Sequence, residues 1–533
     1  MARLSFEVFS RTFRFAYRRA QLGFLADLAS PERAQQRLLL RLVQDLSTTD
    51  YGRHYRLPSN ADYRRFTERV PIVDYDALMP WIKAQQVAGG PVLCPGGAVF
   101  HERTSGSSGA SKDIPYTRAL QASFVRMFLL WAHDTLENGP RLRSGRTFLS
   151  VSPNLAAAPT SLQDDTDYLS PALRFLIGHY LVLPRGLRQV THADSFKRIL
   201  AACLLCEREL EVVSVWSPTY FSSLIEFIEA NRGKLAKDLR AGEIETDGRV
   251  FRLAASAAQR RRSATILESG SLELQVIWPH LRILSCWTDG NAALVLEPLL
   301  RRLPHAVLQS KGLIATEAPM TIPLWHAPGP VPLLSEVFFE LAGADGSIRQ
   351  LHDAHVGERY DLIISQRGGL ARYRIGDQVE VGQAYYRTPT LRFVGRSHQT
   401  SDLVGEKLNE NFVRDTLNSV PRLSQERWML VPAVADGRAR YVCLVEGPQP
   451  AADLADTIDE TLQRAHHYRL ARRLGQLAPV SVERHQRLDD SYLSWSTAQG
   501  RKWGNVKPCA LIADPGRAVS FLQYLRSAEK AHG

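Results

Sequence analysis

Residues 104–112 read Thr-Ser-Gly-Ser-Ser-Gly-Ala-Ser-Lys. They follow GGAVFHER (96–103), which predicts a strand, and precede PYTRALQASFVRMFLLWA (115–132), which predicts a helix. Two glycines allow tight turns, and hydroxyls and backbone N–H groups can donate to phosphate oxygens, to which Lys112 adds a positive charge. The stretch therefore predicts a phosphate-binding loop. The alternative is a flexible linker, which would not usually connect such a strand to such a helix or end in lysine.

The spacing within this stretch excludes three better-known loops. A Walker loop would need Gly at position 111 and Ser or Thr at 113, where the chain has Ser111 and Asp113. The G-x-G-x-x-G spacing of a dinucleotide fingerprint is absent, and so is the G-x-S-x-G elbow of hydrolases. The phosphate-binding loop is therefore of another class.

Outward from this loop, the sequence predicts an α/β fold with a largely parallel sheet. Residues 31–90 predict helices joined by short loops, beginning with PERAQQRLLLRLVQDL (31–46). Buried strands are predicted at RTFLSVS (146–152), LEVVSVWS (210–217), LRILSCW (281–287) and RYDLIISQ (359–366). Helices are predicted at 218–239 and 292–303, and the proline-rich segment 322–334 predicts an ordered loop or an edge. Strands alternating with helices favour α/β layers.

The length of 533 residues favours two or three domains. Near residue 395 a smaller α/β unit begins, with helices predicted at 409–420 and 454–475 and a strand at 440–447. We therefore expect a large N-terminal domain (residues 1–396) and a smaller, mobile C-terminal domain (397–533).

Composition narrows the class of protein. Apolar residues make up 44% and charged residues 23%, which is typical of globular chains. No run approaches the roughly 18 apolar residues of a membrane span, and the arginine-rich N-terminus predicts a docked helix rather than an amphipathic surface helix. Six cysteines are too few for a disulfide scaffold, which favours a cytoplasmic location. The net charge of +11 suits phosphate-bearing or acidic partners, but no basic block indicates nucleic acid, and we expect no membrane partner.

The loop resembles the T-S-G-T-T-G-x-P-K phosphate loop of adenylate-forming enzymes. The chain is most similar to the auxin-responsive Gretchen Hagen family of acyl-acid amido synthetases, in particular to its bacterial members. The resemblance continues through SVWSPTYF (214–221), WPHLRILSCWTDG (278–290), KGLIATEAPMTIPL (311–324), GERYDLIISQRGGLARYRIGDQVEV (357–381), LRFVGRSHQTSDLVGEKLNENFV (391–413) and GRKWGNVKP (500–508). It covers nearly the whole chain, in the family's order.

The resemblance implies an ATP-dependent ligase. A carboxylate attacks the α-phosphorus of ATP, pyrophosphate leaves, and an amine, typically that of an amino acid, captures the acyl-adenylate. Cations and N–H donors stabilise the charge on the phosphates. The alternative acceptors are coenzyme A or a carrier-protein thiol. The alternative class is a non-catalytic nucleotide-binding relative, against which the presence of the matched charged residues argues.

The resemblance also implies residue roles. Thr104, Ser105, Gly106, Ser107, Ser108, Gly109 and Lys112 would bind the β- and γ-phosphates of ATP. Thr316 would contact the α-phosphate or the acyl group, and Glu317 would bind Mg²⁺, as a hard cation requires. Without the other motifs, Thr316 and Glu317 read as a helix cap with an acidic first turn. Plant members carry a serine-rich version of this motif.

Further roles concern the nucleotide and the domain junction. Asp377 would accept hydrogen bonds from the ribose hydroxyls, although Gly376-Asp377 alone is an ordinary turn. The alternation of Arg372 and Arg374 about Tyr373 predicts a strand with one exposed face. Arg396 would reach the ribose or phosphate, residues 397–401 would act as a hinge, and Lys407 is a further phosphate or interface candidate.

Lys507, in GRKWGNVKP, matches the C-terminal lysine that stabilises the attacking carboxylate and the α-phosphate. Lys502 is the alternative, and the following Pro508 favours Lys507. Lys112, Lys311, Lys407 and Lys507 are four of only ten lysines in the chain, and all four fall within matched motifs.

Three other signals are open to interpretation. Trp216 and Tyr220 are candidates to line an acyl pocket, as the matching family segment does. Cys203 and Cys206 form a C-x-x-C without a second pair, for which core packing is the better interpretation. His466-His467 lacks the aspartate of a double-histidine acyltransferase motif, which favours a structural role.

Overall fold

The computed structural model describes residues 2–105, 111–149, 178–184, 186–187, 190, 192–216, 218–246, 248–270, 272–288, 292–396, 400–447, 453–499 and 510–532. These residues form two compact units of mixed α/β structure. The larger unit contains Met1–Thr104, Lys112–Gly290 and Leu296–Gly395, and the smaller unit contains Ser105–Ser111, Asn291–Val295 and Arg396–Gly533. Each unit is described by itself below.

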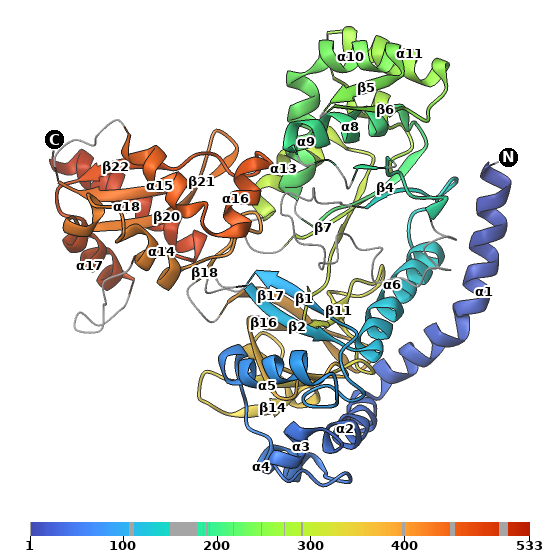
Figure 1. The fold of residues 1–533 in the computed structure, drawn as a ribbon, viewed down its shortest axis with the longest axis vertical. Coiled ribbons are helices and arrows are strands. Elements are labelled where there is room, and N and C mark those ends of the chain that lie inside the picture. The colour runs from blue at the N-terminus through green and yellow to red at the C-terminus, as the bar shows by residue number, and fades with distance from the viewer. Residues whose placement is uncertain are drawn as a thin grey trace. The chain divides into compact units, whose positions relative to one another are not determined.

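The larger unit begins with five helices, α1 (Ala2–Ala29), α2 (Pro31–Ser47), α3 (Asp50–His54), α4 (Tyr63–Arg69) and α5 (Tyr75–Ala88) (Figure 1). Side chains of Thr49, Asp62 and Asp74 accept a backbone N–H of the first turn of α3, α4 and α5, which fixes where these helices begin. The N-terminal helix is docked, because Phe6 of α1 is buried and its ring lies 5.3 Å from that of Tyr180.

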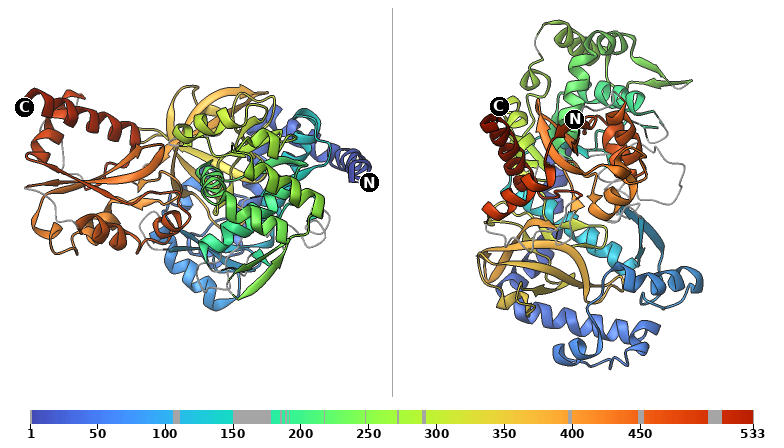
Figure 2. Two further views of the ribbon diagram at one scale, coloured as in Figure 1. Left: turned by 90° about the horizontal axis from the view of Figure 1, so that it is seen from above. Right: turned by 90° about the vertical axis from the view of Figure 1, so that its left-hand side faces the viewer.

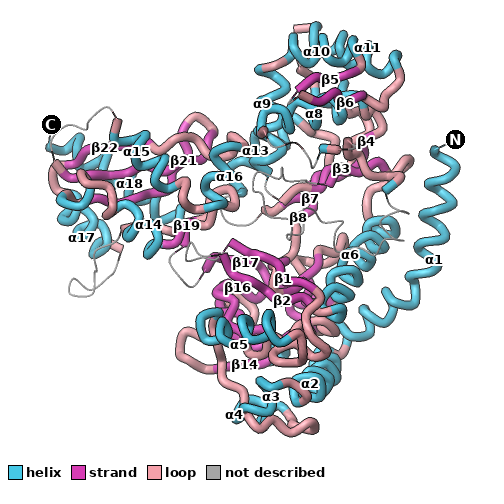
Figure 3. The backbone as a smooth tube through the Cα atoms, in the orientation of Figure 1, coloured by secondary structure: helices cyan, strands magenta, loops and turns pink. Residues whose placement is uncertain are grey.

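The parallel sheet predicted from the sequence is present in the order β3 (Arg146–Leu149), β4 (Leu210–Ser214), β7 (Ile283–Cys286) and β8 (Val307–Ser310), with neighbouring strands parallel. These strands are magenta in Figure 3. Its core includes residues of α8 (Ala193–Cys206), α9 (Pro218–Ala230), α10 (Arg232–Ala241), α11 (Ala257–Glu268), α12 (Leu274–Ile277) and α13 (Ala292–Arg302). A hairpin of β5 (Glu243–Thr246) and β6 (Arg249–Arg252) belongs to the same region. All residues of β4 and β7 are buried, as expected for parallel strands covered on both faces.

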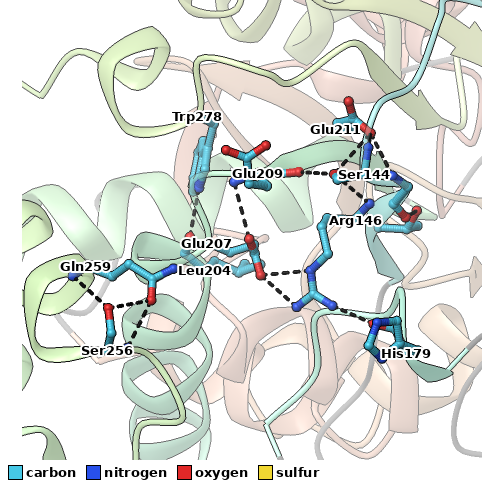
Figure 4. A network of polar contacts seen from close by, with 12 residues as sticks. Ser144, Arg146, His179, Leu204, Glu207, Glu209, Glu211, Ser256, Gln259 and Trp278 are labelled. Carbon is cyan, nitrogen blue, oxygen red and sulfur yellow. Dashed lines mark hydrogen bonds and ion pairs between the residues drawn. The ribbon is translucent and has the colours of Figure 1, made fainter. Parts of the chain in front are cut away.

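A buried carboxylate fixes the entry into this sheet. Glu211, on β4, is 1% exposed and accepts the backbone N–H groups of Arg143, Ser144 and Gly145 at 2.7–2.8 Å (Figure 4). The Ser144 hydroxyl donates to the same carboxylate at 3.1 Å. These bonds satisfy N–H groups that would otherwise be buried without acceptors just before β3.

Two predicted helices are broken. The helix predicted at 218–239 is divided into α9 and α10 at Asn231, and the one predicted at 454–475 is divided into α15 (Leu454–Leu462) and α16 (His466–Arg473). At the first break the Asn231 side chain donates to the carbonyl of Phe227, so an amide side chain occupies a helix acceptor.

The prediction of a largely parallel sheet was wrong for the second sheet of the larger unit. This sheet has the order β14 (Ile348–Gln350), β13 (Val337–Ala342), β15 (Arg359–Gln366), β16 (Tyr373–Tyr385) and β17 (Thr388–Arg396), and β13, β14, β15 and β16 pair antiparallel. RYDLIISQ forms β15 over its full predicted length. Its apolar run is similar to that of a parallel strand because seven of its eight residues are at least half-buried.

Smaller elements frame this second sheet. A two-stranded sheet of β1 (Phe100–Ser105) and β2 (Ser111–Tyr116) leads into α6 (Arg118–Asn138). Short strand pairs follow, β9 (Ile314–Ala315) with β10 (Ala318–Pro319), and β11 (Thr321–Ile322) with β12 (Val331–Pro332). The proline-rich segment therefore forms short strands flanking a loop, as predicted.

Arg372 is buried, so the predicted exposed face at Arg372 was wrong. Its guanidinium donates to both oxygens of Glu340 at 2.8–3.2 Å and to the carbonyls of Thr67 and Val70. Both side chains are at most 8% exposed. The backbone of Arg372 has φ 48°, in the left-handed region, which turns its side chain away from the strand alternation. The pair anchors the beginning of β16 to β13 and α4.

The smaller unit is a three-stranded sheet, β20 (Trp428–Ala435), β21 (Arg438–Glu446) and β22 (Ser481–His485), with helices on both faces (Figure 2). Trp428 and Leu430 share a core with α14 (Glu410–Leu417), α15 and α16, and Met429 and Val431 share another with α17 (Leu488–Ala498) and α18 (Pro515–His532). The strand period of two thus distributes apolar side chains to two layers.

Candidate functional site

Lys112 is the described cation of the predicted phosphate-binding loop. It is half-buried on β2, and its Nζ donates to the Tyr373 hydroxyl at 3.3 Å. Its Nζ also lies 5.4 Å from the ring centroid of Tyr75 and 5.9 Å from that of Tyr373. The Tyr75 hydroxyl accepts the backbone N–H of Asp113 at 2.7 Å, so α5 fixes β2 beside Lys112. Two aromatic faces orient the ammonium without neutralising its charge.

Thr316 and Glu317 form the tight connection between β9 and β10, in which Ala315 pairs with Ala318. The alternative of a helix cap is therefore excluded. The Tyr116 hydroxyl, from β2, donates to the carbonyl of Thr316 at 2.5 Å, and the Gln366 side chain, at the end of β15, donates to the carbonyl of Glu317 at 2.9 Å. Both bonds hold the turn by its backbone.

Glu317 is 7% exposed. Burial raises the pKa of Tyr75 above its usual value, and the charges that add to this shift include Asp113 and Glu317. Glu317 and Lys112 therefore act on the same tyrosine. A carboxylate with a neighbouring hydroxyl offers the hard oxygen donors that Mg²⁺ requires.

Asp377 lies in an irregularity of β16. Ile363 of β15 pairs with Arg374 and Asp361 with Gln378, so one residue of β15, Leu362, stands opposite three residues of β16, 375–377. Gly376 there has φ 87°, which favours glycine. Asp377 is 6% exposed. Such bulges redirect side chains and are common beside active sites, which explains why a turn-like Gly-Asp sits within a strand.

The structure thus brings together three of the predicted motifs. Lys112 bonds to Tyr373, four residues before Asp377 on β16, while Tyr116 of β2 and Gln366 of β15 hold Thr316 and Glu317. Tyr75, Tyr116, Gln366 and Tyr373 were missed from the sequence, because each is one polar residue in an apolar or looped segment and its partner is distant in sequence.

Eight other residues named in the sequence analysis lie outside the described part of the chain. These are Gly106, Ser107, Ser108, Gly109, Ser397, His398, Lys502 and Lys507. Thr104 and Ser105 are the last two residues of β1 and Arg396 is the last of β17, and their side chains are likewise outside it.

The two candidates for the acyl pocket differ in setting. Trp216 follows β4 and is 38% exposed, and the Nζ of Lys311 lies 4.6 Å from its ring centroid. Tyr220, on α9, packs against the core of the parallel sheet, with its ring 6.5 Å from that of Phe148, and burial raises its pKa. Trp216 is therefore the better placed of the two to meet a ligand.

In the smaller unit, Lys407 lies in the connection between β18 (Thr400–Ser401) and β19 (Leu408–Asn409), with φ 49°. The preceding Glu406 is buried and accepts the backbone N–H groups of Leu403 and Val404 at 2.7 Å and the hydroxyl of Tyr441. Burial and the nearby Asp402 raise the pKa of Glu406 to about 7. The connection that carries Lys407 is thus fixed by a buried acid.

The cysteine pair and the histidine pair noted in the sequence have structural interpretations. Burial raises the pKa of the Cys203 and Cys206 thiols to about 12, consistent with core packing on α8. Burial, Lys407 and His466 lower the pKa of His467 to about 3, which favours its neutral form. Within the described ranges, no group of three or more His, Cys, Asp or Glu side chains could hold a metal ion, and no helix is long and apolar enough to cross a membrane.

The two-unit α/β fold, with Lys112, Thr316, Glu317 and Asp377 in its larger unit, has the architecture of an adenylate-forming enzyme. The chain belongs to the GH3 family: the family's N-terminal domain matches residues 23–305 and its central domain matches residues 332–396.

Individual relatives agree with this assignment. The chain is similar to the indole-3-acetic acid-amido synthetase GH3.4 of Arabidopsis thaliana, with 22% identity over 466 residues, 76% of this chain and 74% of that protein. The structure of the AtGH3.15 acyl acid amido synthetase in complex with 2,4-DB matches with a TM-score of 0.65 and 18% identity, covering 96% of each chain. A 2-hydroxyisobutyryl-CoA ligase matches with a TM-score of 0.53 and 14% identity, covering 93% of each chain.

Proposed function

We propose that this protein is an acyl-acid amido synthetase. A carboxylate oxygen of the acid attacks the α-phosphorus of ATP, the bond between the α-phosphorus and the bridging oxygen breaks, and pyrophosphate leaves. The amine of an amino acid then attacks the acyl carbon, AMP leaves with the electrons of the acyl C–O bond, and the amine loses a proton. The observation that supports this most is the convergence of Lys112, Glu317 and the strand of Asp377 in one unit.

Each residue has a role that its chemistry permits. Lys112, oriented by Tyr75 and Tyr373, attracts the β- and γ-phosphates, and the buried carboxylate of Asp377 accepts from the ribose hydroxyls. Glu317 would hold Mg²⁺, and Thr316 would contact the α-phosphate or the acyl group. Mg²⁺, when bound, would neutralise phosphate charge, as in other phosphoryl transfers.

The family resemblance supplies the remaining roles in the proposal. Thr104–Gly109 bind the β- and γ-phosphates, Arg396 binds the ribose or phosphate, Lys407 is a second phosphate or interface cation, and Lys507 stabilises the attacking carboxylate. The domains are divided at 396/397, with residues 397–401 as the hinge. The Ala315-Thr316 pair supports the bacterial branch of the family, and free cysteines at the five described positions support a cytoplasmic location.

Acid-dependent exchange of labelled pyrophosphate into ATP tests adenylation, using a panel of acetate, hexanoate, benzoate, phenylacetate and indole-3-acetate. We expect exchange with at least one acid. Lys112→Met and Asp377→Asn should raise the KM for ATP at least 10-fold, and Glu317→Gln should raise the Mg²⁺ concentration needed. Glu268→Gln, which breaks an exposed ion pair with Arg240, is the control.

The acceptor is decided by the mass of the product. Amino acids, other amines, coenzyme A and a carrier protein are added separately to the enzyme with ATP and the active acid. An amide product supports the proposal, and a thioester would replace it by a ligase of the alternative kind. The absence of exchange with every acid, from folded full-length protein, would favour the non-catalytic relative.

A further inference from the structure

A groove between three helices of the larger unit is lined by residues that belong to none of the matched motifs. It lies between α1, α2 and α6 and has a volume of about 600 Å³. Its apolar walls include Tyr17 and Phe24 of α1, Leu38 of α2, and Val125, Leu129 and Leu130 of α6. Small-molecule sites are typically about 300–1,000 Å³ in volume, with mostly apolar walls and a few polar groups that orient the ligand. The groove therefore has the size and the lining of such a site.

The helices that form the groove are fixed to one another. Arg14 of α1 pairs with Glu137 of α6 at 3.1 Å, and the carbonyl oxygen of Arg14 lies 3.2 Å from Nε2 of His133. Arg37 of α2 pairs with Asp27 of α1 at 2.5 Å. The three helices belong to the larger unit and are labelled in Figure 1. The groove is therefore part of a helical framework and not of a loop.

The charges that line the groove leave one cation over. Arg37 is paired with Asp27, and Arg126 pairs at 3.0 Å with Glu336, which is buried. Arg41, the third arginine of the lining, is exposed. Among the residues that the structure describes, Arg41 has no hydrogen-bond or ion-pair partner. An apolar groove thus carries one guanidinium that is available to a ligand.

The lining is apolar enough to affect the titration of Asp27. Burial raises the pKa of this carboxyl, although Arg37 and Arg126 act in the opposite direction. Burial thus outweighs two cations, as expected where a carboxyl faces apolar side chains more than water. An aliphatic chain that enters the groove would leave water for such surroundings, which the hydrophobic effect favours.

We propose that this groove binds a monoanion with an aliphatic chain, with the chain along Leu38, Val125 and Leu129 and the acidic head at the guanidinium of Arg41. The walls contribute through the hydrophobic effect, and the guanidinium contributes charge-assisted hydrogen bonds to a carboxylate. The same positive charge disfavours a cationic head on an identical chain. The inference is independent of the proposed function, because the groove residues have no role in adenylation.

Decanoate is the probe, and calorimetry on the full-length protein measures its Kd. We expect saturable binding, with decyltrimethylammonium at least 10-fold weaker. Arg41→Met keeps an apolar side chain and removes the charge. It should raise the Kd for decanoate about 5- to 20-fold and leave that for 1-decanol within about 2-fold. Arg33→Met, at another exposed arginine of α2, is the control and should leave both values unchanged.

A second variant fills the groove. Gly23 of α1 lines it, and a Cβ there would meet no atom within 4 Å, so a larger side chain can enter without displacing a neighbour. Gly23→Phe should abolish decanoate binding in the groove, and it also replaces a poor helix former. Gly233→Phe on α10, where a Cβ likewise meets no atom within 4 Å, is the matched control and should bind decanoate like the parent protein.

The outcomes distinguish this inference from the proposed function. A decanoate Kd that is unchanged in both Arg41→Met and Gly23→Phe places the bound acid elsewhere, at the adenylation site for example, and overturns the inference. Equal affinity for decanoate and decyltrimethylammonium, or no binding of decanoate, also overturns it. A change of oligomeric state in Gly23→Phe, measured by analytical ultracentrifugation, would assign the groove to a protein partner instead. Pyrophosphate exchange should be the same in these variants as in the parent protein, so either proposal can fail alone.

Discussion

Replacing Arg372 by methionine tests how the beginning of β16 is held. The change removes five described hydrogen bonds, three to the Glu340 carboxylate and two to the carbonyls of Thr67 and Val70. Glu340 is 1% exposed, and the hydroxyl of Tyr63 at 3.1 Å is then too weak a partner to replace a guanidinium. Leaving a buried charge uncompensated costs about 3–5 kcal/mol, so we expect the free energy of unfolding to fall by that amount.

The double variant Arg372→Met with Glu340→Gln separates the contribution of the ion pair from that of the hydrogen bonds to the two carbonyls. Without the carboxylate no charge is left buried, and the remaining loss comes from the two carbonyls that have lost their donor, about 1–3 kcal/mol each at most. The double variant should therefore be more stable than Arg372→Met alone. Urea unfolding followed by circular dichroism measures both, with Arg240→Met, from the exposed pair with Glu268, as the control.

Two results would refute this reasoning. One is a loss in Arg372→Met no larger than in the Arg240→Met control, which would mean that the buried pair contributes nothing measurable. The other is a double variant whose loss equals the sum of the two single losses, because residues that interact must show a coupling energy.

The remaining predictions concern the turn, the aromatic contact and the buried acid. Tyr116→Phe removes the donor to the Thr316 carbonyl and should lower kcat for pyrophosphate exchange about 3- to 30-fold with little change in the melting temperature; an unchanged kcat would contradict the role of this bond. Tyr373→Phe removes the acceptor of Lys112 and should raise the KM for ATP a few-fold, measured by the same exchange. Because the folded-state pKa of Glu406, about 7, lies above its usual value, the folded chain holds the extra proton and the free energy of unfolding should fall by about 1.4 kcal/mol per pH unit as the pH rises from about 4.5 to 7. Glu406→Gln should flatten this slope in urea titrations over that range, and an unaltered slope would place the titration elsewhere.

The sequence predicts elements better than their assembly. RYDLIISQ forms a strand from Arg359 to Gln366 because β-branched and apolar residues have a local preference, but that preference does not say whether the neighbouring strand is parallel. The prediction for Arg372 is wrong for a related reason. Its partner Glu340 is 32 residues away, and its positive φ breaks the strand alternation on which the prediction of an exposed face rests.

The candidate site divides in the same way. Lys112, Glu317 and Asp377 are identified by motifs because their chemistry is local, whereas Lys311 lies in a matched motif that gives it no role. It contacts Ser214 and Trp216, which precede it by about a hundred residues and reach it because parallel strands end at one edge. Such a contact follows from the order and direction of the strands in the sheet, which the residue pattern of a single segment does not determine.

The hydrogen bonds that hold the turn of Thr316 and Glu317 leave the side chains of this turn available to a ligand. Tyr116 and Gln366 both donate to carbonyl oxygens of the turn and not to its side chains. The bonds that position the turn therefore use none of the hydrogen-bonding capacity of the Thr316 hydroxyl or the Glu317 carboxylate. Lys112 is oriented by the same principle, through a neutral hydroxyl and two ring faces rather than a carboxylate. A site built to meet a triphosphate gains from this arrangement, because a cation neutralised by a fixed anion would attract phosphate less strongly.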